Sequence, residues 1–333
     1  MIASAQAQPN IALIKYWGKR DSSLNIPCAG SLSLTLDSLW TRTRVAFDAA
    51  LEADELRING GEDPAALRRC SGFLDLLRGR AGCSARARVE TRNNFPTGAG
   101  LASSASGFAA LAVAAAEALG LSLDAAELSR LARRGSGSAA RSIFGGFVEM
   151  AAGERADGSD AFARPLLEAD AWPLRVVIAV TTWQAKDVGS TAGMELTRRT
   201  SPFYSQWLDT ADADLDTARA AVQARDFQAL AEVSEHSCLK MHALMLATRP
   251  PLLYWTGATV DCLHRIRRLR ERDGLGVFFT VDAGPQVKAV CLPQDAERVS
   301  RALGEIPGVE RVLCSGLGEG ARWLDTAEAA QCE

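Results

Sequence analysis

The chain has little of what marks secreted, membrane-spanning or nucleic-acid-binding proteins. Its 333 residues carry a net charge of −3, so no excess of basic residues is available to neutralise a nucleic acid. Residues 1–9 lack the basic start and apolar core of a signal peptide, and the Ala-rich stretch at 106–119 is short and interrupted by Glu117. We therefore expect neither a nucleic-acid partner nor a membrane partner.

Paired cysteines and metal-ligand patterns are also missing from the sequence. The chain has eight cysteines but no Cys-x-x-Cys pair, and its three histidines make no metal-ligand spacing with them. This pattern predicts reduced thiols in a cytoplasmic protein.

Apolar residues are plentiful enough for two substantial cores, at 47% of the chain. Alternating or β-branched runs predict strands at residues 10–16, 31–36, 41–47, 55–58, 85–91, 175–181, 276–281, 287–291 and 311–314. Helical periodicity predicts helices at 64–80 and 106–119, one capped by Asp124 and reaching Arg133, several between 191 and 272, and one at 296–303. This order indicates an α+β fold with domains at 1–182 and 183–333.

The most informative segment is a Gly/Ser-rich loop at residues 96–105 that leads into the Ala-rich helix. Small residues let backbone N–H groups approach an anion, and a helix start adds unpaired N–H groups and the positive end of its dipole. No lysine follows Gly100, as a P-loop requires, and Ser103 stands at the third glycine position of a dinucleotide fingerprint. An ordinary turn would explain the glycines but not the clustered serines. The segment therefore predicts a phosphate site of another kind.

A second Gly/Ser-rich segment, at residues 133–142, adds guanidinium groups to small residues and hydroxyls. The planar fork of Arg141 suits a carboxylate, because it can donate two parallel hydrogen bonds. Taken alone, a surface loop with incidental arginines explains this segment equally well.

Two strand ends carry further candidates. Lys15 and Lys19 flank Tyr16 and Trp17 at the end of the strand predicted at 10–16, which indicates a polyanionic ligand packed against an apolar wall. Asp282 follows the apolar strand predicted at 276–281. It either caps the tight turn after it or acts as a catalytic base.

Together these segments resemble the diphosphomevalonate decarboxylase family, a branch of the GHMP small-molecule kinase superfamily. The resemblance spans nearly the whole chain and rests on residues 10–20, 93–105, 135–146, 186–188 and 280–285. The loop at 96–105 is shared by many kinases of the superfamily, whereas the other segments resemble the decarboxylases. The resemblance implies an α+β, two-domain GHMP-kinase fold with a cleft between the domains, and a homodimer.

The resemblance also implies a reaction and a set of site residues. ATP with Mg²⁺ and mevalonate 5-diphosphate would bind in one cleft, and phosphorylation of the 3-hydroxyl would lead to release of phosphate and CO₂, leaving isopentenyl diphosphate. The implied catalytic residues are Asp282, Lys15, Arg141 and Asn10. The implied substrate contacts are Tyr16, Trp17, Lys19, Ser136, Gly137, Ser138 and Arg141. The implied ATP contacts are Gly98, Gly100, Leu101, Ala102, Ser103 and Ser104, with Ser104 also a ligand of Mg²⁺. An adenine pocket is implied near Asn59, Gly60 and the helix that follows.

Each implied catalytic residue has a chemical reason. Asp282 would orient or deprotonate the 3-hydroxyl, and Lys15 would keep that carboxylate ionised and offset charge on the moving phosphoryl group. Arg141 and Asn10 would hold the substrate carboxylate in line with the developing charge at C3.

Some alternatives stay open at this point. The family usually has a polar Thr-Asn-Ser-Ser at the substrate loop where this chain reads Cys-Ala-Gly-Ser at residues 28–31, which leaves open a C5 monophosphate substrate. A mevalonate 3-kinase or a non-catalytic metabolite sensor could share the fold. The joint presence of Asp282, Lys15 and Arg141 favours decarboxylation over both.

Overall fold

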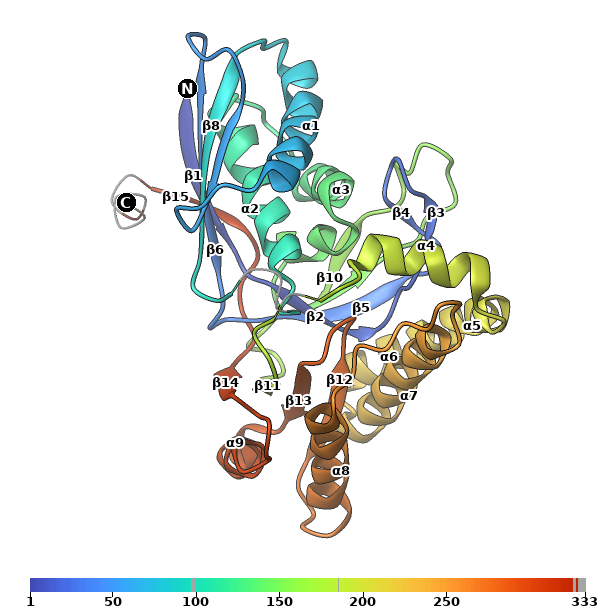
Figure 1. Cartoon of the computed structure of the whole chain (residues 1–333). Coiled ribbons are helices and arrows are strands. Elements are labelled where there is room, and N and C mark those ends of the chain that lie inside the picture. The colour runs from blue at the N-terminus through green and yellow to red at the C-terminus, as the bar shows by residue number, and fades with distance from the viewer. Residues whose placement is uncertain (97–99, 185, 326–327, 329–333) are drawn as a thin grey trace.

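Strands from both ends of the chain form one sheet in the computed structural model, which describes residues 1–96, 100–184, 186–325 and 328. This five-stranded sheet has the order β15-β1-β6-β8-β7 and lies in the upper part of Figure 1. Its strands are β1 (Ile2–Ala7), β6 (Thr41–Asp48), β7 (Glu55–Ile58), β8 (Arg86–Asn93) and β15 (Arg322–Leu324). Because β15 pairs antiparallel with β1, the last described strand of the chain returns to its first.

Two four-stranded sheets form the middle and bottom of the molecule in Figure 1. The middle sheet has the order β10-β9-β5-β2 and consists of β2 (Asn10–Ile14), β5 (Ser31–Thr35), β9 (Phe147–Met150) and β10 (Ala163–Leu167). The bottom sheet has the order β12-β13-β11-β14 and consists of β11 (Arg175–Val180), β12 (Val277–Val281), β13 (Val287–Cys291) and β14 (Arg311–Ser315). A short ribbon of β3 (Lys19–Asp21) and β4 (Ile26–Pro27) extends from the middle sheet.

Helices cover one face of the upper sheet and flank the lower ones (Figure 1). They are α1 (Pro64–Ala81), α2 (Ser103–Ala118), α3 (Ala125–Gly135), α4 (Ser190–Thr200), α5 (Tyr204–Asp209), α6 (Ala211–Ala224), α7 (Phe227–Leu246), α8 (Gly257–Glu271) and α9 (Ala296–Gly304). Two 3₁₀ helices lie at Gly137–Ile143 and Pro293–Asp295. In the described part of the chain, no helix combines the length and apolar character needed to span a bilayer.

Local sequence signals set the ends of several helices. The Asp63 carboxylate accepts hydrogen bonds from the N–H groups of Ala65 and Ala66 at the start of α1, which ends at the left-handed Gly82. The capping box predicted for Asp124 at the start of α3 is confirmed, because the backbone and side chain of Glu127 complete it. The helix predicted at 106–119 begins three residues earlier, at Ser103.

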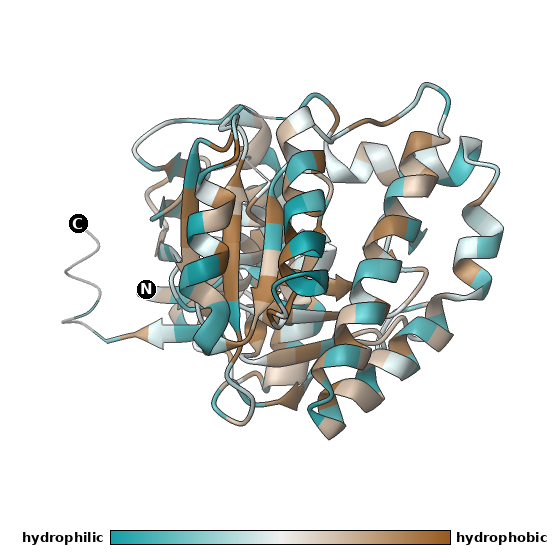
Figure 2. Ribbon diagram, turned by 90° about the horizontal axis from the view of Figure 1, so that it is seen from below, coloured by the Kyte–Doolittle hydropathy of each residue, from teal (hydrophilic) through white to brown (hydrophobic). Residues whose placement is uncertain are grey.

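Apolar packing explains how the layers meet. The alanines of α2 are buried between the upper sheet, α1 and α3, and their small side chains let these elements approach closely. Figure 2 shows hydrophobic residues on the strands and hydrophilic residues on the outward helix faces. The strands β2, β5, β11, β12 and β13 are almost completely buried, so they carry near-continuous apolar runs.

All nine predicted strands are present, but the prediction omitted β1, β9, β10, β15 and the β3–β4 ribbon. Most of these are short or lie at sheet edges, where a period-2 pattern is weakly marked. The proposed division after residue 182 stays a prediction. Two sets of strand pairings cross this division. Strand β11, before residue 182, pairs with β13 and β14, and β15, after residue 182, pairs with β1.

A buried ion pair fixes α1 against the upper sheet and provides a stability test. Both Nη atoms of Arg78 lie 2.9 Å from the two carboxylate oxygens of Asp54, and the side chains are 5% and 3% exposed. Replacing Asp54 with Ala leaves the guanidinium buried without this partner and should lower the free energy of unfolding by ~3–5 kcal/mol. Asp75→Ala removes an exposed partner of the same arginine and should cost less than about 1 kcal/mol. Urea denaturation measures both, and equal losses would contradict the argument.

Candidate active site

A large cleft brings the sequence candidates together. It has a volume of about 1260 Å³ and lies between the upper sheet with its helices and the elements around α4, α7 and the end of β12. The candidate residues that line it are Asn10, Lys15, Tyr16, Trp17, Lys19, Gly100, Ala102, Ser103, Ser104, Ser136, Gly137, Ser138, Arg141 and Asp282. Leu101 instead packs into a hydrophobic core, so a contact with ATP would involve its backbone. Gly98 lies outside the described residues.

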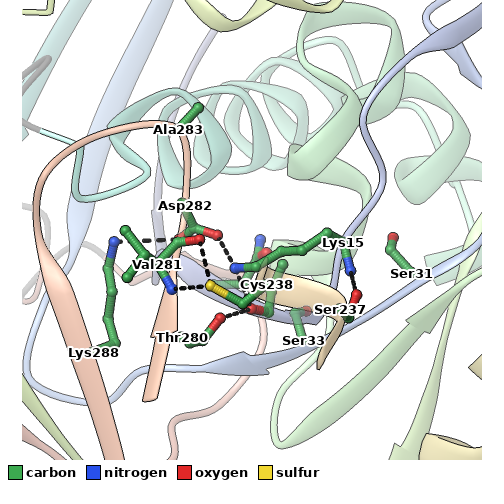
Figure 3. Close-up of polar contacts among 12 residues, drawn as sticks. Lys15, Ser31, Ser33, Ser237, Cys238, Thr280, Val281, Asp282, Ala283 and Lys288 are labelled. Carbon is green, nitrogen blue, oxygen red and sulfur yellow. Dashed lines mark hydrogen bonds and ion pairs between the residues drawn. The ribbon is translucent and has the colours of Figure 1, made fainter. Parts of the chain in front are cut away.

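Asp282 and Lys15 form the ion pair at the centre of this cleft. Asp282 directly follows β12, and its side chain is 27% exposed, whereas the Lys15 side chain after β2 is 2% exposed. Lys15 Nζ lies 2.6 Å from Asp282 Oδ1, and Lys288 Nζ lies 3.3 Å from Asp282 Oδ2 (Figure 3). Burial alone would raise the pKa of Asp282, but the charges of Lys15 and Lys288 outweigh it and hold that pKa well below its usual range. Asp282 is therefore an ionised acceptor that faces the cleft.

Hydrogen bonds behind the ion pair hold its strands in place. The Val281 N–H donates to Cys238 Sγ at 3.2 Å, and the Lys15 N–H donates to Ser237 Oγ at 3.0 Å, so α7 supports both strand ends. The Thr280 hydroxyl donates to the Ala12 carbonyl at 3.1 Å. Figure 3 shows these contacts below the carboxylate, on the side away from the turn at Ala283.

Arg141 lies at the wall of the cleft, with hydrogen-bond acceptors around its guanidinium group and the Tyr16 ring 5.9 Å away. Its guanidinium donates to Asn10 Oδ1 at 3.1 Å from Nη2, to Ser31 Oγ at 2.6 Å from Nη1, and to Ser33 Oγ at 3.0 Å from Nε. Asn10 Nδ2 in turn donates to Ser142 Oγ at 2.8 Å. Each Nη nitrogen donates one of its two N–H hydrogens in these bonds and keeps a second.

The segment at 133–142 is more ordered than a surface loop. Residues Gly137–Ile143 form a 3₁₀ helix, and Arg141 within it is buried, so the alternative of a surface loop with incidental arginines is wrong. Ser136 Oγ lies 3.3 Å from Ser138 Oγ and 3.4 Å from Ser104 Oγ, which places hydroxyls of both Gly/Ser-rich segments side by side. A Cβ atom at Gly137 would lie 2.3 Å from the Tyr16 hydroxyl oxygen, so glycine is required for this close approach.

Lys19 lies on β3 and also lines the cleft. Its ammonium group donates to Asn25 Oδ1 at 2.6 Å and to Thr191 Oγ1 at 3.2 Å, which links the ribbon to the start of α4. Burial lowers the pKa of Lys19, and the nearby charge of Arg69 lowers it further. Trp17 is almost completely buried and donates from Nε1 to Thr197 Oγ1 at 2.9 Å.

The start of α2 lines the cleft with the small residues that sequence reasoning predicted to hold phosphate. Its N-cap, Ala102, has a left-handed φ of 58° and provides no side-chain cap, and the Ala105 N–H donates to the Ala102 carbonyl at 2.9 Å. The cleft continues past Ser103 and Ser104 into an apolar arm. The apolar residues that line this arm are Leu56, Ile58, Phe73, Leu76, Phe108 and Leu111. Helix α1 lines this arm with Phe73 and Leu76, whereas Asn59 and Gly60 do not line the cleft. The adenine pocket stays a prediction.

Sequence reasoning assigned no individual site role to several polar residues of this region, although Ser31 belongs to the predicted substrate loop. Ser31 and Ser33 on β5 hold Arg141, and Lys288 on β13 contacts Asp282. Lys186 Nζ donates to Ser190 Oγ at 2.8 Å and to the Ala283 carbonyl at 2.9 Å. Lys186 had a signal, because it belongs to a segment that carries the family resemblance, whereas Lys288 lies within an apolar strand pattern.

Two family models match the chain and together cover most of it. The "Diphosphomevalonate decarboxylase-like N-terminal domain" matches residues 7–163, and the "Mevalonate 5-diphosphate decarboxylase C-terminal domain" matches residues 176–314. The chain belongs to the diphosphomevalonate decarboxylase family. The predicted α+β, two-domain GHMP-kinase fold is confirmed by the solved structures of this family.

Characterised relatives support the same assignment. The diphosphomevalonate decarboxylase of Aspergillus fumigatus is 40% identical over 92% of this chain and 80% of its own length. The human diphosphomevalonate decarboxylase is 38% identical over 84% of this chain and 74% of its own length.

Solved structures of family members superpose closely. The mevalonate diphosphate decarboxylase of Staphylococcus aureus matches with a TM-score of 0.91 and 41% identity, covering 98% of this chain and 99% of that one. A protein named MDDEF, solved in complex with MVAPP, AMPPCP and magnesium, matches with a TM-score of 0.90 and 40% identity over 98% of this chain and 100% of that one. This chain therefore shares its fold with a protein that was solved with AMPPCP and magnesium bound.

Proposed function

We propose that this chain catalyses the ATP-dependent decarboxylation of mevalonate 5-diphosphate to isopentenyl diphosphate, with release of ADP, phosphate and CO₂. The observation that carries the proposal is the joint placement in one cleft of an ionised Asp282, the Arg141 fork and the start of α2 with its two serines. Kinase chemistry needs the first and third of these, whereas decarboxylation also needs a group that holds the substrate carboxylate.

The residues suggest a division of labour along the cleft. Asp282 accepts a hydrogen bond from the 3-hydroxyl and receives its proton as the phosphoryl group moves, while Lys15 stabilises the negative charge on the carboxylate and the phosphoryl oxygens. After phosphate has left, the C1–C2 bond breaks and its electron pair forms the new C2–C3 double bond. Arg141 and Asn10 align the substrate carboxylate for this step.

The substrate diphosphate and the ATP triphosphate would occupy different parts of the cleft. We propose that Tyr16, Lys19 and Ser136 to Ser138 hold the substrate diphosphate, with Trp17 as the apolar wall. Gly100, Ser103 and Ser104 at the start of α2 hold the ATP phosphates, with the base in the apolar arm.

Magnesium fits this arrangement as a partner of the nucleotide. Among residues 1–96, 100–184, 186–325 and 328, no group of three or more His, Cys, Asp or Glu side chains is placed to hold a metal ion. The donor set near α2 is instead hydroxyls, and Ser104 Oγ would complete a shell supplied mainly by phosphate oxygens and water. Bound Mg²⁺ would neutralise phosphate charge during transfer.

The decisive experiment is an assay of purified protein with ATP and Mg²⁺ against mevalonate, its 5-phosphate and its 5-diphosphate. ADP, CO₂ and isopentenyl diphosphate should form in equal amounts from the 5-diphosphate alone. ADP without CO₂ would mean a 3-kinase, turnover of the 5-phosphate would mean a monophosphate decarboxylase, and no turnover would favour a metabolite sensor.

Lys186 should set the alkaline limit of activity. Burial lowers its pKa to about 8, although Asp282 raises that pKa and Lys288 lowers it further. Lys186 lines the cleft and donates to the Ala283 carbonyl beside Asp282. Because a lowered pKa means that the ammonium form is lost as pH rises through about 8, kcat/KM should fall above this pH. Lys186→Arg keeps the charge and should move the limit to higher pH, whereas Lys240→Arg, at a position that does not line the cleft, should leave it unchanged. If activity falls near pH 8 in the unsubstituted protein and in both variants, Lys186 does not set the alkaline limit.

We further propose a homodimer that works in the cytoplasm. The family resemblance supports the dimer, and the free thiols of Cys28, Cys70, Cys83, Cys238, Cys262, Cys291 and Cys314 support a reducing compartment. Light scattering coupled to size-exclusion chromatography tests the dimer.

A further inference from the structure

Lys288 is a buried cation that the family resemblance did not assign. It lies on β13, opposite Thr280 of β12 and Ile178 of β11, in a strand whose residues are all buried. Its side chain is 2% exposed. A lysine held at that depth usually has a fixed partner, because an unpaired ammonium group is costly to bury.

Lys288 Nζ contacts two elements that are far apart in the sequence. It lies 3.3 Å from Asp282 Oδ2 and donates a hydrogen bond to the Gly100 carbonyl at 3.1 Å. Gly100 belongs to the Gly/Ser-rich loop, and Asp282 is the carboxylate paired with Lys15 on its other oxygen. One ammonium group thus joins the loop before α2 to the central carboxylate.

Backbone packing at the same point shows why the link has a defined geometry. Gly100 has a φ of +76°, and a Cβ atom built on Gly284 would lie 3.4 Å from Gly100 Cα. The turn after Asp282 therefore packs directly on the loop, with no side chain between them. The position of Gly100 relative to Asp282 depends on this contact and on the Lys288 bridge.

We propose that Lys288 is a positioning residue for the reaction, which holds the Asp282 carboxylate and the phosphate loop at Gly100 in one fixed arrangement. The inference rests on the proposed function. Phosphoryl transfer requires the carboxylate, the acceptor hydroxyl and the phosphate loop to be aligned, and a misplacement of about 1 Å can cost about 10²-fold in rate.

Lys288 also contributes to the charge state of the carboxylate. The titratable and charged groups that act on Asp282 or lie around it come from five elements or loops and are Lys15, Lys186, Lys288, Arg141, Cys238 and His242. Lys15 and Lys288 are the two that contact it directly. Loss of the Lys288 charge leaves one direct cation, so the pKa of Asp282 should rise by about one unit.

Two substitutions separate geometry from charge. Lys288→Met fills a similar volume but removes both the donor and the charge. Lys288→Gln removes the charge yet keeps an amide that can donate to Gly100 O and Asp282 Oδ2. The matched control is Lys240→Met, because Lys240 pairs with Asp214 at 2.7 Å on α6 and α7, outside the cleft.

The experiment measures kcat, both KM values and the Asp282 carboxyl pKa, the last by carbon NMR with labelled aspartate. In Lys288→Met we expect kcat to fall about 10²-fold, KM to change less, and the pKa to rise. Lys288→Gln should show the same pKa shift with a smaller loss of kcat, and Lys240→Met should match the unsubstituted protein. Circular dichroism checks folding, and Lys288→Gln carries the test if Lys288→Met does not fold.

Two results would overturn the proposal: a kcat within about threefold of the unsubstituted protein in the folded Lys288 variants, or an Asp282 pKa that does not move. Because the NMR titration needs no substrate, it separates this inference from the proposed function. Absence of turnover in the unsubstituted protein would refute the function but leave the titration result standing.

Discussion

Asp282→Asn should lower kcat by about 10³-fold while nucleotide binding persists. The amide cannot take the proton of the 3-hydroxyl, and it removes the negative charge shared by Lys15 at 2.6 Å and Lys288 at 3.3 Å. The apolar arm and the start of α2, which are proposed to hold ATP, are formed by other residues. Steady-state kinetics and calorimetric titration with a non-hydrolysable ATP analogue measure the two effects separately.

The control for this variant is Asp214→Asn. Asp214 also accepts from a lysine, Lys240, at 2.7 Å, but it lies outside the cleft. Both variants should show folded circular dichroism spectra, and Asp214→Asn should keep kcat. Unchanged turnover in folded Asp282→Asn would refute the role assigned to this carboxylate.

Arg141→Gln should lower kcat by about 10²- to 10³-fold and raise the KM of the substrate much less. Glutamine can still donate one hydrogen bond toward Asn10 or Ser31, but it has neither the fork nor the charge that aligns a carboxylate. ADP and CO₂ should be followed together, because the role assigned to Arg141 concerns the cleavage of the C1–C2 bond.

Arg130→Gln is the control for this variant. Arg130 lies on α3, donates to the Ser159 carbonyl at 2.7 Å and does not line the cleft. It should leave both products unaffected. A large rise in KM with normal kcat in Arg141→Gln would mean that the guanidinium serves binding rather than alignment.

The substrate loop at residues 28–31 differs from the polar sequence that is usual in the family. Turnover of a C5 monophosphate therefore stays an alternative outcome of the assay. Cys28 Sγ lies 3.2 Å from the Tyr204 hydroxyl, so this thiol is engaged with α5. A Cβ atom at Gly30 would lie 2.5 Å from a methyl carbon of Leu215, so Leu215 fills the space that a side chain at position 30 would need. The departure at residues 28–31 is therefore accompanied by close packing from α5 and α6.

Local chemistry in the sequence determined the elements and the kinds of site. Asp124 and Glu127 mark the start of α3 because a capping box is complete within one turn. The serines at the start of α2 predict an anion site because the first N–H groups of a helix have no acceptor within the helix. Asp282 could be singled out because a lone carboxylate at the end of an apolar strand indicates either a cap of the following turn or a catalytic base. These signals lie within a few residues of one another.

Only the tertiary structure decided which of these groups meet. Lys15 contacts the carboxylate of Asp282, which is 267 residues away in the chain. Arg141 donates hydrogen bonds to Ser31 and Ser33 on β5. Lys288 joins Gly100 to Asp282 from within a strand whose sequence pattern is apolar, and the pairing of β15 with β1 adds an edge strand to the upper sheet. Periodicity states which face of an element is buried, but not which element covers it, because that choice depends on packing between segments far apart in the chain.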